Sequence, residues 1–173
     1  MLLKLLTVLL LVSSNAFADS SAGVSVGVNQ GSTVGEEITA GDMTGSLLSA
    51  QLDYTFEDAQ MSIGYFYTTH ETRFTPEETI PNFDLILNTQ TLRLGILVGN
   101  TPIYAGYIFD AKVEDSTDDL EGFGYLIGTN IYISSRVSLG LELSFVSFDH
   151  LNGQRIDDAQ ILLASTSIIF FLW

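Results

Sequence analysis

The two histidines of the chain, and a serine that follows an aspartate in an acidic segment, are its candidates for acid–base or nucleophilic chemistry. The histidines are His70 and His150, and Ser116 follows Asp115 inside a dense acidic segment. A histidine that takes the proton of a serine hydroxyl is a common arrangement for acyl transfer. Two histidines are also ordinary in a chain of 173 residues without any catalysis. We therefore expect no enzyme activity and assign no catalytic residue.

The acidic segment could instead hold a metal ion. It reads Glu114-Asp115-Ser116-Thr117-Asp118-Asp119-Leu120-Glu121 and lacks the glycine and the distal glutamate of a calcium-binding loop. The chain also has no cysteine, which excludes disulfides and thiolate metal sites. We predict no specific metal site and no cofactor.

The overall charge narrows the possible partners. There are 21 acidic against 6 basic residues, a formal charge of −15. Such a chain repels phosphate backbones, so nucleic acid is not expected as a partner. Because 46% of the residues are apolar and only 16% charged, the chain is not a disordered acidic tail.

The N-terminus has the pattern of an export signal. Residues 1–18 contain Lys4, a largely apolar stretch from Leu5 to Val12, and Ala16-Phe17-Ala18, a small-x-small cleavage site. The apolar stretch is too short to span a bilayer. We predict a signal peptide over residues 1–18, cleaved after Ala18, and one domain over residues 19–173.

Side chains in the rest of the chain alternate with period two, which predicts strands. Eight are expected, at residues 22–30, 45–56, 59–69, 85–98, 103–113, 122–133, 137–148 and 159–173. The connections between them are alternately long and short, which is the pattern of an antiparallel up-and-down sheet with long loops at one end.

The two faces of the expected strands differ in size as well as in polarity. In residues 122–133 one face is bulky and the other is largely glycine and small polar residues; the bulky residues are Phe123, Tyr125, Ile127, Ile131 and Ile133. Bulky faces suit hydrocarbon, and small polar faces suit the interior of a narrow barrel. Because a sheet in lipid cannot leave edges unpaired, the prediction is an all-β, eight-stranded transmembrane barrel. A soluble ligand-binding barrel, released from cells without detergent, is the alternative.

Aromatic side chains are expected at the two membrane interfaces. The candidates at the turn end are Tyr54, Phe56, Phe171 and Trp173. Those at the loop end are Tyr65, Tyr67, Phe109, Tyr125 and Phe145.

The last strand carries a family resemblance. Ile169, Phe171 and Trp173 alternate and end on a terminal aromatic residue, which resembles the insertion signal of bacterial outer-membrane barrels. With the export signal and eight strands, the chain resembles the small OmpA- and OmpX-like barrels. This resemblance implies insertion into the bacterial outer membrane by the barrel-assembly machinery, periplasmic termini, and contact with outer-membrane lipid and lipopolysaccharide.

The long loops would then form an acidic outer rim. Fifteen of the 21 acidic residues fall in the four long connections, with only Arg73 and Arg155 to oppose them. Such a rim could recruit divalent cations and so bridge to the phosphates of lipopolysaccharide. It could equally be a plain solvated surface.

Five charged residues are expected to point into the barrel: Asp53, Arg93, Asp110, Lys112 and Glu142. Arg93 and Glu142 should lie at a similar height and face one another as an ion pair across the lumen. An unpaired charge in a narrow lumen is costly, by ~3–5 kcal/mol, so pairing is expected. Such a pair would obstruct the flow of water.

The expected function is therefore a non-enzymatic outer-membrane barrel that supports envelope integrity or surface interaction. One alternative is a lipid A-modifying enzyme with His70 and His150 at the outer rim. Lipid A deacylase barrels carry a His-x-Ser element, which His150-Leu151-Asn152 does not match, whereas Asp115-Ser116 with His70 resembles the arrangement of lipid A palmitoyltransferase barrels. A narrow channel or uptake protein is the other alternative.

Overall fold

The computed structural model describes residues 20–34, 40–56, 60–77, 81–99, 101–114 and 119–172. The predicted signal peptide, Ser116 and Trp173 lie outside these residues. No helix long and apolar enough to cross a membrane occurs in the described part of the chain.

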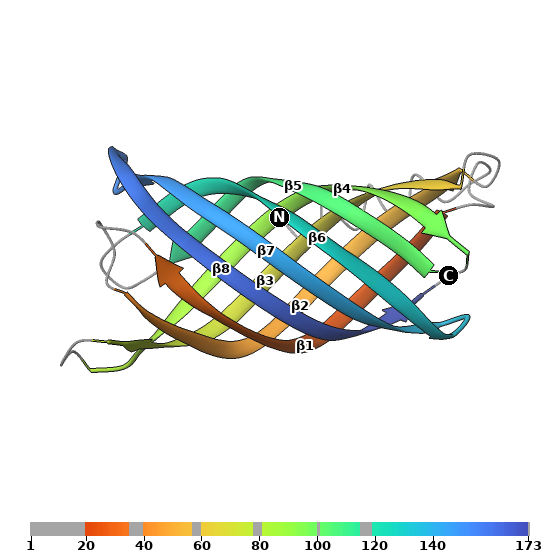
Figure 1. Ribbon diagram of the computed structural model, residues 1–173, viewed down its shortest axis with the longest axis horizontal. Helices are drawn as coiled ribbons and strands as arrows, with labels where there is room; N and C mark the ends of the chain where they lie inside the picture. The colour runs from red at the N-terminus through yellow and green to blue at the C-terminus, as the bar shows by residue number, and fades with distance from the viewer. Residues whose placement is uncertain are drawn as a thin grey trace.

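Eight antiparallel strands close into one barrel in sequence order, as the alternation predicts (Figure 1). The strands are β1 (Ser20–Val34), β2 (Gly41–Phe56), β3 (Met61–Pro76), β4 (Phe83–Val98), β5 (Thr101–Glu114), β6 (Asp119–Ser134), β7 (Val137–Leu151) and β8 (Gln154–Phe171). β1 pairs with β8 from Gly23↔Phe171 to Val34↔Gln160, which closes the ring. Every strand therefore has two neighbours.

The strands extend further than predicted at the loop end. β3 ends at Pro76 rather than at Thr69, and β2 begins at Gly41 rather than at Gly45. The expected long connection between β7 and β8 is wrong: Leu151 pairs with Gln154 across a tight turn of Asn152 and Gly153. Both turn residues have positive φ, 52° and 77°, as a two-residue Asn-Gly hairpin requires.

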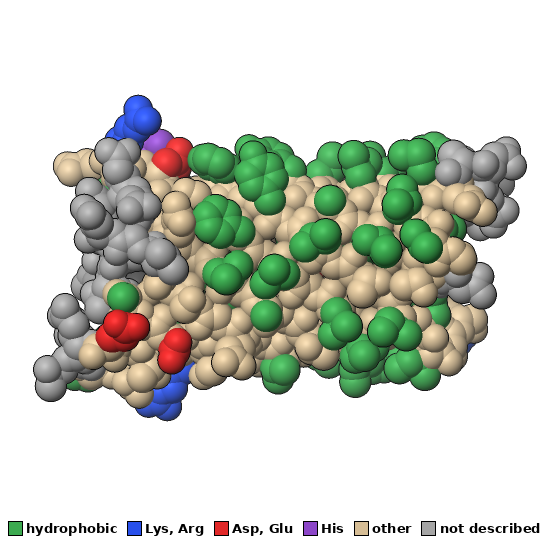
Figure 2. Space-filling model, viewed as in Figure 1, with side chains coloured by type: hydrophobic (Ala, Val, Ile, Leu, Met, Phe, Trp, Pro, Cys, Tyr) green, Lys and Arg blue, Asp and Glu red, His purple; other side chains and the backbone are tan. Residues whose placement is uncertain are grey.

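Large apolar side chains cover the outside of the barrel over its turn-end part. Ile127 is 56% exposed, Ile131 46% and Leu141 38%, so the bulky faces point outward as predicted. Figure 2 shows hydrophobic side chains over the middle and right of the barrel, and charged side chains gathered at the left, loop end. This outward apolar surface is called the apolar band below.

The facing of β8 is decided by pairing with both neighbours. Leu162, Ile168 and Phe170 point outward, each more than 40% exposed, whereas Ile169 is 3% exposed and points into the lumen. Phe171 lies against Tyr132, with 5.9 Å between ring centroids. The expectation that Phe171 joins an outward aromatic belt is therefore wrong, because it shares the inward face with Ile169.

The polarity of the wall reverses along the barrel axis. Beyond the apolar band, most outward positions are polar, as Thr44, Glu71, Arg73 and Gln160 illustrate; Ile86 is an exception. At the same level the inward positions become apolar and buried, as Met43, Phe74 and Ile161 do. The loop-end part of the barrel thus resembles a water-soluble barrel with an apolar core. The strand extensions were missed because the pattern of bulky residues changes face there.

Candidate functional site: the closed lumen

An ion pair crosses the lumen in the part surrounded by the apolar band. Arg93 on β4 donates through Nη2 to Glu142 Oε2 on β7, and their side chains are 9% and 15% exposed. The guanidinium carbon also lies 3.3 Å from the ring centroid of Phe66 and 4.4 Å from that of Tyr104. Two aromatic faces and one carboxylate therefore hold Arg93 in place.

Small polar side chains surround this pair. Gln51 Nε2 donates to Asp53 Oδ2 at 3.0 Å, and the hydroxyls of Ser25 and Ser49 lie 2.5 Å apart. The void that Arg93 and Glu142 help to line has a volume of about 20 Å³, enough for about one water molecule. The lumen at this level is packed by its own side chains.

His70 does not lie at the outer rim, which corrects the sequence prediction. It belongs to β3, points inward and is 3% exposed. Its Nδ1 lies 3.0 Å from Nδ2 of Asn29 on β1. Thr69 and Glu71, its neighbours in sequence, face outward, so the extension of β3 beyond Thr69 carries His70 to the inside.

His150 stays near the loop end of the barrel. Its Nδ1 lies 3.0 Å from Asp149 Oδ1, and both side chains are 44% exposed. Within the described residues, no group of three or more His, Cys, Asp or Glu side chains is arranged to hold a metal ion. The structure therefore does not bring His70 and His150 together in one site.

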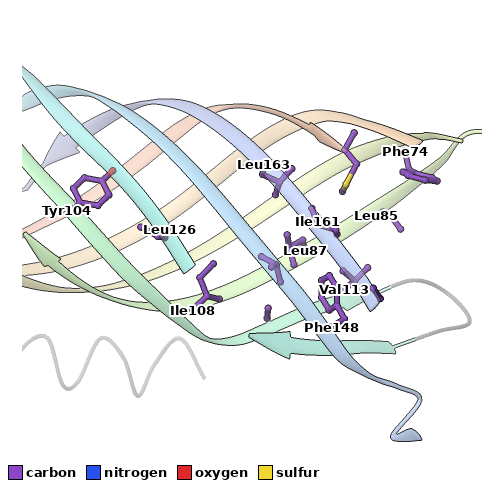
Figure 3. Close-up of a cluster of buried hydrophobic side chains, with 14 residues drawn as sticks. Phe74, Leu85, Leu87, Tyr104, Ile108, Val113, Leu126, Phe148, Ile161 and Leu163 are labelled. Atoms are coloured by element: carbon purple, nitrogen blue, oxygen red, sulfur yellow. The ribbon is translucent and has the colours of Figure 1, made fainter. Parts of the chain in front are cut away.

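An apolar cluster, called the apolar plug, fills the loop-end half of the lumen, and its members Tyr104 and Leu126 extend down to the level of Arg93. Figure 3 shows its side chains converging from the surrounding strands, with Phe74, Leu87 and Phe148 among them. Among the described residues, every strand except β1 contributes; the members are Met43, Phe74, Leu85, Leu87, Tyr104, Ile108, Ala111, Val113, Leu126, Val146, Phe148, Ala159, Ile161 and Leu163. Its large members Phe148, Met43 and Leu87 are at most 1% exposed. Thr33 and Thr72 are buried at the same level, in register with the plug residues Ile161 and Leu85, so the lining there is predominantly apolar.

Asp110 and Lys112 lie on the outer wall, so their predicted placement in the lumen is wrong. Gln90 on β4 pairs with Asp110, and the adjacent Thr91 pairs with Ile108, which leaves Phe109 as an extra residue in β5. A bulge of this kind shifts the alternation by one position. Ala111 is consequently fully buried, and Lys112 Nζ lies outside, 2.9 Å from Glu121 Oε1.

A hydrogen-bonded group on the outer wall was missed by the sequence analysis. Tyr65 Oη donates to Gln90 Oε1 at 2.8 Å, and Gln90 Nε2 donates to Asp110 Oδ2. Next to them, Thr69 Oγ1 donates to Asn88 Oδ1 at 2.9 Å. Asn88 and Gln90 interrupt an otherwise apolar outward face of β4, and this interruption was the available signal.

Comparison by sequence found no relatives: neither a family model nor a curated protein matches the chain. Comparison of structures found several solved barrels. Neisserial surface protein A is 15% identical with a TM-score of 0.56, and the match covers 87% of this chain and 97% of that one.

Two further structures are similar at comparable identity. Ail, the attachment invasion locus protein of Yersinia pestis, solved with the heparin analogue sucrose octasulfate, is 12% identical with a TM-score of 0.58, covering 89% of this chain and 99% of that one. The outer-membrane protein AlkL, determined by solid-state NMR in lipid bilayers, is 12% identical with a TM-score of 0.50, covering 92% and 93%. The chain has the fold of the small eight-stranded outer-membrane β-barrels.

Proposed function

We propose that the chain is a non-enzymatic protein of the bacterial outer membrane, a closed barrel that contributes to envelope integrity and presents a rigid surface to the exterior. The observation that carries this proposal is the reversal of wall polarity along the axis. An apolar outside around a polar lumen suits a bilayer, and a polar outside around an apolar plug suits water.

We also infer that the loop end of the barrel projects from the membrane. β4 has 16 residues and, at ~3.3 Å per residue and a tilt of ~40°, extends about 40 Å along the barrel axis. The hydrocarbon layer accounts for ~25 Å of this. The remaining length projects from the membrane on the loop side, so the surface offered to the exterior is a stiff β-wall as well as loops.

Acidic residues on this projecting wall favour a role at the cell surface. Asp42, Glu71 and Asp84 belong to strands at the loop end. Glu36, Glu37 and Asp115, also assigned to the rim, lie outside the described residues. We propose that the rim recruits divalent cations, which would reduce repulsion between the protein and the phosphates of lipopolysaccharide.

The closed lumen supports this role over that of a channel. Two barriers lie in series along the axis: the Arg93–Glu142 pair within the band and the apolar plug above it. The burial of His70 supports a non-enzymatic role, because a base that points into the lumen cannot reach a lipid on the outer face of the barrel.

Cell fractionation followed by a heat-modifiability gel tests the proposal. We expect the full chain in the outer-membrane fraction, resistant to extraction without detergent, with different mobility before and after boiling. Mass spectrometry of the membrane-inserted protein should give an N-terminus at Asp19, as expected after cleavage of residues 1–18. Recovery of the chain in a soluble fraction would overturn the membrane assignment.

A further inference from the structure

The outer wall formed by β3, β4, β5 and β6 carries a cluster of polar and charged side chains. This group, called the lateral patch, consists of Tyr65, Asn88, Gln90, Asp110, Lys112 and Glu121. Its side chains are linked by Tyr65–Gln90–Asp110 hydrogen bonds and by the Lys112–Glu121 ion pair at 2.9 Å. Four adjacent strands contribute to it.

The lateral patch lies at the upper boundary of the apolar band. On β4, Leu92 and Leu94 are 46% and 57% exposed on the outside, and Gln90 is the next outward residue towards the loop end. On β5, Tyr107 and Phe109 are exposed and Asp110 follows directly. In a bilayer this level is the junction of acyl chains and headgroups.

On β1, β2 and β7, on the other side of the barrel, the described outward residues at this level are uncharged. Where the band ends on β1, β2 and β7, the next outward residues are Gln30, Ser46 and Ser147. These carry no charge. The bulge at Phe109 turns Asp110 and Lys112 to the outer face of β5, so their presence on the outer wall results from a specific backbone feature.

The chemistry of the lateral patch suits a phosphorylated sugar. Carboxylate and amide oxygens of Asp110, Glu121 and Gln90 accept hydrogen bonds from hydroxyl groups, and the ammonium of Lys112, in a side chain that is 46% exposed, can meet a phosphate. Below them the rings of Tyr107 and Tyr125 lie 5.5 Å apart on the outer wall, where an amphipathic ring meets both sugar and acyl chain.

The width of the lateral patch favours a large headgroup. Neighbouring strands lie ~4.8 Å apart, so four strands span about 15 Å. A single ethanolamine or glycerol headgroup would engage one part of this width. A disaccharide would cover more of this width.

We propose that the lateral patch binds the phosphorylated saccharide headgroup of an outer-leaflet glycolipid, with its acyl chains against Leu92, Leu94 and Tyr107. This inference rests on the proposed outer-membrane location. It assigns one side of the barrel, β3–β6, as the glycolipid-binding face.

The test measures retention of defined lipids by the purified full chain with native mass spectrometry. The probes are lipid A, dephosphorylated lipid A, phosphatidylethanolamine and phosphatidylglycerol. We expect the unaltered protein to retain lipid A in preference to both phospholipids. The double variant Gln90→Leu/Asp110→Leu should bind lipid A about tenfold more weakly, a change of ~1.4 kcal/mol. Lys112→Gln should remove the preference for the phosphorylated form.

Gln30→Leu/Thr44→Leu is the matched control, because these two outward residues also pair directly across neighbouring strands, on the other side of the barrel. It should retain lipid A unchanged. Equal lipid A binding by the Gln90→Leu/Asp110→Leu variant, equal loss in the control, or equal retention of phosphatidylethanolamine by the unaltered protein would overturn the inference. All variants are first checked for heat modifiability in lipid. A protein that inserts without preferring lipid A contradicts only this inference, whereas one that does not insert contradicts the proposed function.

Discussion

Ile108 and Asp110 are two residues apart in one strand and lie on opposite faces of the barrel wall. Ile108 is 1% exposed within the apolar plug, whereas Asp110 accepts a hydrogen bond from Gln90 on the outside. In a regular strand two such residues share a face. The extra residue Phe109 separates them, and it keeps Asp110 and Lys112 out of the apolar plug.

Deletion of Phe109 should leave the barrel intact. Without Phe109, residues 108, 110 and 111 alternate regularly, and every pair with β4 and β6 on either side of the bulge is preserved. We expect a heat-modifiable barrel that loses about 1 kcal/mol or less, since the Phe109 ring lies 6.3 Å from that of Tyr65. Urea unfolding in lipid vesicles provides the measurement.

Deletion of Leu92 is the control for this prediction. Leu92 is also apolar and faces outward, on the adjacent strand β4. Its removal would turn every β4 residue on one side of position 92, Arg93 included, to the opposite face of the barrel wall. No folded barrel should form. Equal tolerance of the two deletions would contradict the role assigned to the bulge.

Removal of one partner of the lumen ion pair should destabilise the barrel strongly. Glu142→Ala leaves the buried Arg93 guanidinium without its carboxylate, at an expected cost of ~3–5 kcal/mol in the free energy of unfolding. The double variant Arg93→Met/Glu142→Leu removes both charges and should recover most of this loss. Urea titrations of the unaltered protein, Glu142→Ala and the double variant in the same vesicles measure these free energies of unfolding. A double variant no more stable than Glu142→Ala would refute the pairing argument.

Opening the ion pair alone should not open a channel. The apolar plug lies above the pair and includes Phe148, which is 1% exposed. Planar bilayer recordings of the unaltered protein, Arg93→Ala and Glu142→Ala are all expected to show no steady conductance. Stepwise currents from any inserted protein of this set would show that the lumen is not sealed by the plug.

Three arginine substitutions along β4 should report the reversal of polarity. Leu92→Arg places a charge in the apolar band and should cost ~2–4 kcal/mol, whereas Ile86→Arg, outward but beyond the band, should cost ~0–1 kcal/mol. Leu87→Arg points into the apolar plug and should prevent folding, because Leu87 is fully buried. Urea unfolding in vesicles ranks the free-energy costs of the three substitutions. A similar cost at Ile86 and Leu92 would place the membrane boundary elsewhere.

Much of the fold could be predicted from residue types alone. Period-two alternation, bulky on one face and small on the other, identified eight strands, their order and the outward direction of residues such as Ile127 and Leu141. It also suggested that Arg93 and Glu142 meet, and the structure places them in contact. These features follow from local periodicity, which the sequence carries directly.

Strand ends were predicted less well, for a physical reason. A strand that leaves the bilayer keeps its backbone pairing, but its apolar residues now point inward and its polar residues outward. The pattern of bulky outward and small inward side chains therefore no longer identifies it. His70 and Phe74 were assigned to a loop on this account, and both point into the barrel. The dipeptide Asn152-Gly153 is a two-residue turn signal, and the structure forms a tight hairpin there instead of a long loop.

The sequence by itself determined the number of strands, their order and the match of their outer faces to hydrocarbon, because these depend on each strand's own pattern of side chains. Only the tertiary structure decided the faces of Asp110, Lys112 and Ile169, because facing depends on register with two neighbours. A bulge of one residue reverses which face the following side chains occupy. In a strand that is apolar on both faces, such as β8, the inward face is known only once both neighbouring strands are paired.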